Sequence, residues 1–247
     1  MKILSHAQQP ELLEHFEQME SDAFPEFMLH DSIWNEHWPL VISAFADLQL
    51  YLVDETTGEL AGVFNSVPVF WDGTTEGLPH SEHEVLARSL RHRREGRAVT
   101  TLCGIQVAVA DSHSGKGVAI RALKEGLGLC RQHGLSHLIA PIRPTLKHLY
   151  PTIPFEEYID WKRPDGAAFD PWIRTQIAGG AQRLGVCREP MRFEGSVSDW
   201  EEWTGLELPA SGRYVIDGAL DLLHVDVDAD LCWLEESNVW YGYTVRS

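Results

Sequence analysis

The sequence predicts an α/β protein built around a mixed β-sheet, and three observations support this fold class. Apolar residues recur at helical spacing in the first 46 residues and again over residues 118–133. Two segments rich in β-forming residues, 48–54 and 59–70, flank a turn and predict an antiparallel hairpin. Strand, helix and strand patterns follow one another within residues 101–142, which predicts a parallel βαβ unit.

Further elements follow from the same two periodicities. Residues 101–110 form a short, continuous apolar run, which is typical of a central strand buried on both faces. Gly134 follows the predicted helix 118–133 at the position of a C-cap. The patterns also predict helices over 12–19, 33–45 and 81–96 and near Asp170 and Ser198, and strands over 137–142, 155–162, 184–195, 213–227 and 238–245.

The chain is long enough to bury a sizeable core without disulfides or a structural metal. It has 247 residues, of which 44% are hydrophobic and 23% charged, as in an ordinary globular protein. No repeat or linker interrupts it, so we expect a single elaborated domain over residues 1–247. Its parts would be N-terminal helices and a hairpin (1–100), a core (101–160) and a C-terminal extension of the same sheet (161–247).

Charge and cysteine usage narrow the class of protein. The formal net charge of −17 would repel nucleic-acid backbones and anionic membranes, so we expect no nucleic-acid or membrane partner. The chain has no run of 18 apolar residues and no secretory signal at its start, which predicts a cytoplasmic protein. Its cysteines lack a CxxC pair and read as free thiols: Cys103, Cys130, Cys187 and Cys232.

The segment Val109–Ala119 lies where the predicted central strand ends and a long helix begins. Such a junction presents unpaired backbone N–H groups and the positive end of a helix dipole, which together bind phosphate oxygens. Two nucleotide-binding signatures fail here. A Walker A loop is excluded by Ala110 and Gly117, and a dinucleotide-binding fingerprint is excluded by Ile120.

The same segment resembles the pyrophosphate loop of the GNAT acyltransferases, Val-x-Pro-x-x-Arg-Gly-x-Gly-x-Gly/Ala. Val109, Gly115, Lys116, Gly117 and Ala119 match this pattern. Asp111 replaces its proline, and Ser114 replaces its arginine. A glycine pair that merely permits tight strand-to-helix packing is the alternative interpretation of the loop.

A second motif agrees with the first in order and spacing. Residues 143–155 resemble the superfamily's Asn-Pro-x-Ala-x-x-Leu-Tyr-x-x-x-Gly-Phe, with Leu149, Tyr150 and Phe155 in register. Arg143 replaces its asparagine, and Pro154 replaces its glycine. The remaining chain is similar to an enlarged bacterial, acetyltransferase-like GNAT subfamily of unassigned acceptor, through residues 150–161, 169–176, 199–205 and 236–240.

The resemblance implies a GNAT-like, mostly antiparallel sheet with one splayed pair of parallel strands. The pantetheine arm of acetyl-CoA would enter the gap between those strands and bind the freed backbone like an added strand, at Val107 and Val109. Residues 101–160 would then form the acyl-CoA-binding core. The diphosphate would meet the backbone amides of the loop and helix start, at Ser114, Gly115, Lys116, Gly117, Val118 and Ala119, with Lys116 as an added cation if it turns inward.

The resemblance also implies an acid for the leaving thiolate, at Tyr150, since a tyrosine hydroxyl is protonated at neutral pH. Its alternative role is that of a core tyrosine. An amine must lose a proton before it attacks, but the sequence assigns no base: Gln106 on the predicted strand cannot titrate. The other carboxylates considered, Glu156, Glu157, Glu235 and Glu236, are residue types that usually lie on the surface.

Metal chemistry has little support in the sequence. Asp226, Asp228 and Asp230 lack the glycine and glutamate that complete a calcium loop, and His80 and His83 lack a third ligand, so no metal is expected. The sequence therefore predicts an acetyltransferase that uses acetyl-CoA and a small amine acceptor, with a homodimer compatible with this scheme. The alternative is a non-catalytic acyl-CoA-binding sensor or interaction module on the same fold.

Overall fold

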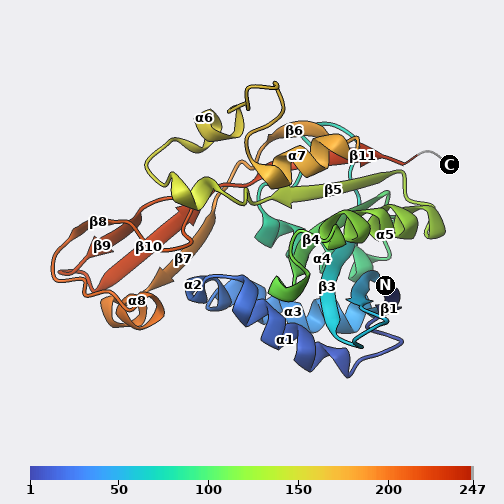
Figure 1. Cartoon of the computed structure of the whole chain (residues 1–247), viewed down its shortest axis with the longest axis horizontal. Coiled ribbons are helices and arrows are strands. Elements are labelled where there is room, and N and C mark those ends of the chain that lie inside the picture. The colour runs from blue at the N-terminus through green and yellow to red at the C-terminus, as the bar shows by residue number, and fades with distance from the viewer. Residues whose placement is uncertain (246–247) are drawn as a thin grey trace.

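The computed structural model describes residues 1–245, in which one seven-stranded sheet forms the main body (Figure 1). All neighbouring strands are antiparallel except β4 and β5, which are parallel. The mostly antiparallel sheet with one parallel pair is thus confirmed. The strands, in spatial order, are β1 (Lys2–Ser5), β2 (Gln49–Val53), β3 (Leu60–Val69), β4 (Thr101–Val109), β5 (His137–Ile142), β11 (Val239–Thr244) and β6 (Gln182–Val186).

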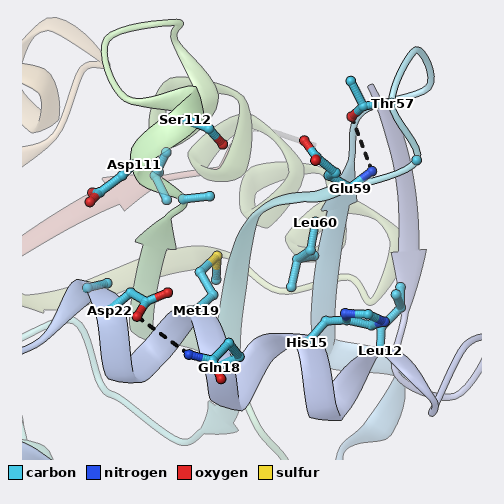
Figure 2. A pocket seen from close by; sticks show the side chains of 14 residues that line it. Leu12, His15, Gln18, Met19, Asp22, Thr57, Glu59, Leu60, Asp111 and Ser112 are labelled. Carbon is cyan, nitrogen blue, oxygen red and sulfur yellow. Dashed lines mark hydrogen bonds between the residues drawn. The ribbon is translucent and has the colours of Figure 1, made fainter.

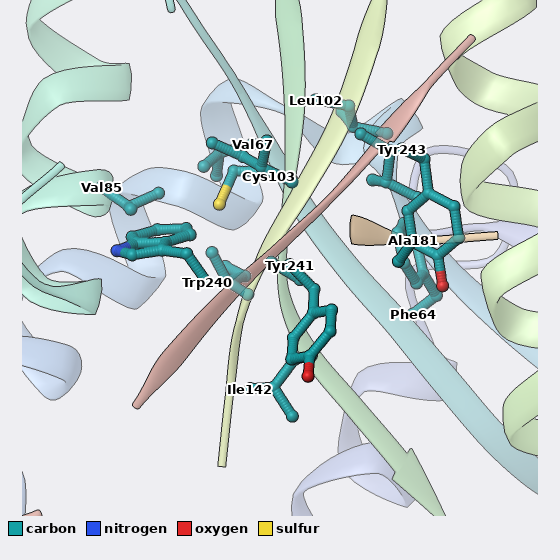
Figure 3. Close-up of a cluster of buried hydrophobic side chains, with 14 of the residues drawn as sticks. Phe64, Val67, Val85, Leu102, Cys103, Ile142, Ala181, Trp240, Tyr241 and Tyr243 are labelled. Atoms are coloured by element: carbon teal, nitrogen blue, oxygen red, sulfur yellow. The ribbon is translucent and has the colours of Figure 1, made fainter. Parts of the chain in front are cut away.

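Helices cover both faces of the main sheet. Helix α1 (Leu12–Ala23) packs on the face that carries Val63, and α5 (Val118–Gln132) packs on the opposite face, against Phe64. Helix α4 (Glu82–Glu95) lies on the α1 side together with α3 (Ser32–Ala44). Figure 3 shows Val85 of α4 beside Cys103 and Trp240, with Phe64 and Tyr243 on the other side of the strands.

Side-chain caps define where several helices begin. Asp31 accepts hydrogen bonds from the amides of Ile33 and Trp34 at the start of α3. Ser81 caps α4, and Asp170 caps α7 (Pro171–Ala178) in the same way. The predicted helices at 33–45 and 81–96 and near Asp170 are confirmed within a few residues. Three short 3₁₀ helices complete the connections: η1 (Ala46–Leu48), η2 (Asp111–His113) and η3 (Lys147–Leu149).

A second, four-stranded sheet lies beside the main one (Figure 1). Its strands, in spatial order, are β7 (Met191–Gly195), β10 (Leu231–Glu236), β9 (Leu223–Asp226) and β8 (Gly212–Tyr214). Helix α8 (Val197–Thr204) contributes the fully buried Trp200 to its separate core, and α2 (Glu26–Leu29) contributes Phe27. Within residues 161–245, only β6 and β11 extend the main sheet, so the expected extension over 161–247 is partly wrong.

Two other predictions for the C-terminal third need correction. The predicted strand 155–162 is a short helix, α6 (Phe155–Ile159), because Pro154 starts it and the amide of Tyr158 bonds back to Pro154 O. The predicted strand 184–195 is divided between two sheets, as β6 and β7. No helix within residues 1–245 is both long and apolar enough to cross a bilayer. A single domain over 1–247 stays a prediction.

Candidate acyl-CoA site

Strands β4 and β5 are paired only at their beginnings. The pairs are Thr101–His137, Leu102–Leu138 and Cys103–Ile139. β4 continues to Val109 along β3, and β5 continues to Ile142 along β11, but within the described chain the two no longer pair with each other. The facing edges of residues 104–109 and 140–142 therefore border a gap with backbone groups on both sides.

A β-bulge lies directly after the last pair. Asn65 of β3 pairs with Gln106 while Ser66 pairs with Gly104, so Ile105 is an extra residue in β4. Bulges bend a strand and increase its twist, which gives a local cause for the divergence from β5. Gly104 fits the crowded floor of the gap: a Cβ there would lie 3.3 Å from the Phe64 ring and 3.8 Å from the Ala140 Cβ.

The loop after β4 leads into α5 through two glycines in the left-handed region. Their φ values are 72° at Gly115 and 79° at Gly117. Within residues 1–245, the amides of Gly115, Gly117, Val118 and Ala119 donate to no protein acceptor, whereas Ser114 N donates to Asp111 O and Lys116 N to His113 O. Four of the six residues expected to meet a diphosphate therefore offer an unpaired N–H group.

The side chains of this loop take different positions. Lys116 is exposed, and Val118 is buried with its side chain next to Gly62 of β3. His113 is buried and lies 3.1 Å from the Asp54 carboxylate. A backbone hydrogen bond from Thr56 and then the bond to His113 lower the pKa of Asp54 to about 2. This link, which no sequence pattern indicated, fixes the loop to the end of β2.

Tyr150 follows η3 and stands in an aromatic cluster. Its ring packs edge-on against Trp161 at 4.9 Å between centroids and also contacts Tyr158 and Phe169. Within the described chain its hydroxyl makes no hydrogen bond. Lys147 is buried and donates to Tyr150 O at 2.9 Å, so it holds the backbone of the tyrosine.

Arg143, at the position of the family's asparagine, joins β5 to the second sheet. Its guanidinium donates to both oxygens of Glu236, at 2.7 and 3.0 Å, and to Gly218 O. Glu236 is buried and paired in this way, so it is not available as a base. Glu235 pairs with Arg192 on the surface of the second sheet.

Two other carboxylates, which the sequence analysis did not single out, lie on the α1 and α4 face of the sheet. Gln106 Nε2 donates to Glu20 of α1 at 2.6 Å, and burial raises the pKa of Glu20. Burial, together with the negative charge of Asp31, raises the pKa of Glu82 to about 8. Neither residue follows a recognisable motif, because the long-range packing of helices on the sheet brings them there.

A cavity of about 620 Å³ lies between α1, the β2–β3 turn and η2 (Figure 2). Asp22, Glu59 and Asp111 line it, so its charge would repel the phosphates of a coenzyme A. Met19 lines the cavity and packs in one cluster with Phe16 and Ala108. Within residues 1–245, no group of three His, Cys, Asp or Glu side chains could hold a metal ion.

Parallel strands that part beside a glycine-rich helix start define an acyl-CoA N-acyltransferase type of fold, and solved structures agree. The loading GNATL domain of CurA from Lyngbya majuscula matches with a TM-score of 0.61 and 16% identity, over 99% of this chain and 97% of its own. The GphF GNAT-like decarboxylase in complex with isobutyryl-CoA matches with a TM-score of 0.60 and 14% identity, over the whole of both chains.

A curated sequence relative is the arginine N-acetyltransferase avaD of Aspergillus versicolor. It is 29% identical over 205 residues, which are 77% of this chain and 70% of that protein. No family model matches the chain. The solved structures confirm the predicted GNAT-like fold, and the chain is similar in sequence to an acetyltransferase, as the resemblance implied.

Proposed function

We propose that the protein transfers an acetyl group from acetyl-CoA to a small amine by direct attack of the amine on the thioester. One observation carries the proposal: β4 and β5 part after Cys103 and Ile139, and β4 then leads into a loop with unpaired amides at the start of α5. Backbone groups along a parted strand suit the amides of a pantetheine arm. Unpaired amides at a helix start suit a diphosphate.

In this scheme the coenzyme lies along the second half of β4. Val107 and Val109 would bind the pantetheine arm through their backbone. Gly115, Gly117, Val118 and Ala119 would bind the diphosphate through their amides, while the exposed side chains of Ser114 and Lys116 remain able to turn toward it. Because these contacts are local, the net charge of −17 does not oppose them.

The reaction needs proton transfers at both ends. As the neutral amine forms its bond to the carbonyl carbon, the carbon–sulfur bond breaks, the electron pair leaves with the sulfur, and the acylated nitrogen gives up one proton to solvent. Tyr150 would give its hydroxyl proton to this thiolate and regain one from solvent. Its hydroxyl supports the role because no protein acceptor within residues 1–245 engages it, while three aromatic rings fix the side chain.

The acceptor is proposed to be a cationic small molecule with a primary amine, and arginine is the first to test. The curated relative is named for arginine, and the excess of acidic over basic residues, 37 to 20, favours a positively charged molecule near the protein.

Calorimetry and thiol release test the proposal. Titration with acetyl-CoA should give measurable heat, and addition of arginine or a related amine should release free thiol. Binding without release, across a panel of amines, would instead support the acyl-CoA sensor. No heat at millimolar acetyl-CoA would overturn both. Since one structural neighbour is a GNAT-like decarboxylase, a separate assay should supply malonyl-CoA and measure the loss of CO₂.

A further inference from the structure

The position of the reacting carbon follows from the proposed function, on which this inference rests. A diphosphate at residues 115–119 and a pantetheine arm along Val109 and Val107 place the thioester nearer the start of β4. It cannot pass the pair Cys103–Ile139, where β4 and β5 close on each other. The acetyl carbon must therefore lie beside residues 104–106.

Gln106 is the polar side chain of that short stretch. It lies two residues before Ala108, which packs on α1, so it faces α1 as well. Asn65 Nδ2 donates to Gln106 Oε1 at 2.6 Å, and Gln106 Nε2 donates to Glu20 Oε1 at 2.6 Å. These two bonds fix both the orientation of the glutamine and the position of the glutamate.

We propose that Glu20 is the general base that takes the proton from the acceptor amine. The ammonium form of the acceptor would give one N–H proton to the Glu20 carboxylate, directly or through one water. The freed lone pair then forms the N–C bond, the C–S bond breaks, and the sulfur takes its proton from Tyr150. The acylated nitrogen gives up its second proton to solvent, from which the tyrosinate is protonated again, and Glu20 releases its proton to solvent. Gln106 is a positioning residue that holds the carboxylate beside the gap.

The charges around Glu20 suit this task. Burial raises its pKa, the hydrogen bond from Gln106 lowers it, and the negative charge of Glu17 on the same helix raises it. Within residues 1–245 Glu20 forms no ion pair; its side-chain partner is the neutral amide of Gln106, which in turn accepts from Asn65. A carboxylate that is raised in pKa and lacks a countercharge accepts a proton more readily near neutral pH.

Other carboxylates in this part of the molecule are bound to other side chains or line a different cavity. Glu236 is held by Arg143. Glu82 accepts a hydrogen bond from Asn238. Its charge contributes to the raised pKa of Cys103, which lies where β4 and β5 are still paired. Asp22, Glu59 and Asp111 line the cavity between α1, the β2–β3 turn and η2, and in the described part of the chain none of them bonds to a residue of β4.

The test compares Glu20→Gln with Glu14→Gln, a matched control on the exposed side of the same helix. In a thiol-release assay with acetyl-CoA and the amine found in the panel, Glu20→Gln should lower kcat at pH 7 about 100-fold or more. Its acetyl-CoA Kd by calorimetry should stay within about twofold of the parent, as for a residue that acts on the acceptor. Glu14→Gln should keep kcat within about twofold.

A third variant separates a base from a merely structural glutamate. Gln106→Leu removes the hydrogen bond that lowers the Glu20 pKa, so the acidic limb of the kcat profile should move to higher pH. Glu20→Gln should remove that limb. Unchanged kcat in Glu20→Gln would overturn the assignment alone. Absence of thiol release by the unsubstituted protein with every amine would overturn the proposed function and, with it, this assignment.

Discussion

Cys103 and Ile139 form the last residue pair between β4 and β5, and the bulge at Ile105 follows within two residues. The order matters, because a bend placed directly after the last pair separates the two strands while β4 stays attached to β3. The core on the α5 side must then fill the space under the diverging strands. Phe64 does so, with its ring between Gly104 and Gly126.

The packing of Phe64 predicts opposite effects for two glycines of α5. A Cβ at Gly126 would lie 2.4 Å from the Phe64 ring, whereas a Cβ at Gly128 meets nothing within 4 Å. Gly126→Ala should therefore lower the free energy of unfolding by about 1–3 kcal/mol through overpacking. Gly128→Ala should raise it by about 0.5–1 kcal/mol through helix propensity. Urea denaturation measures both free energies of unfolding. If both substitutions changed the free energy of unfolding in the same direction, the close contact between Gly126 and the Phe64 ring would be contradicted.

Tyr150→Phe tests the proposed acid. The ring contacts with Trp161 and Phe169 would remain, so the fold and the acetyl-CoA Kd should be nearly unchanged. Thiol release should slow by about 10²-fold or more, because the thiolate loses its proton donor. Tyr214→Phe, which removes a hydroxyl from the second sheet, is the control and should leave kcat as it is. An equal kcat in both variants would remove Tyr150 from this role.

The sequence predicted the middle of the chain better than its end. The helix 118–133 and the strands around it have strong local periodicity, so α5, β4 and β5 appear where expected. Residues 155–162 carry β-forming side chains, but Pro154 and the packing of Tyr158 under the aromatic cluster favour a helix. Gly115 and Gly117 were found from their spacing. Glu20, in contrast, reaches Gln106 across 86 residues, and no local pattern reports such a contact.

Gly117→Ala tests the loop at the start of α5. A Cβ there has open space, but the φ of 79° is unfavourable for alanine, so the substitution should cost about 1 kcal/mol of stability. Relief of that strain would turn the unpaired amides away from a diphosphate, and the acetyl-CoA Kd should rise at least about tenfold.

Gly134→Ala, with a φ of 65° after the other end of α5, is the control and should cost similar stability without a change in Kd. Calorimetry distinguishes the two, and matching Kd values would count against diphosphate binding at this loop.

Glu82 predicts how stability depends on pH. Its pKa rises from 4.5 in the unfolded chain to about 8 in the folded protein, chiefly through burial. The unfolded state therefore loses this proton first as pH increases, and the stability associated with the protonated carboxyl is full below pH 4.5 and lost on passing through pH 8.

Glu82→Gln keeps the neutral form at every pH and preserves the polar contact to Asn238. The Tm of the variant should exceed that of the parent by more at pH 8.5 than at pH 5, as measured by thermal denaturation across that range. Glu189→Gln, which removes an exposed carboxylate near the same end of α4, serves as the control and should shift Tm little at either pH. If the Tm difference between Glu82→Gln and the parent were the same at pH 5 and pH 8.5, Glu82 would ionise normally in the folded protein.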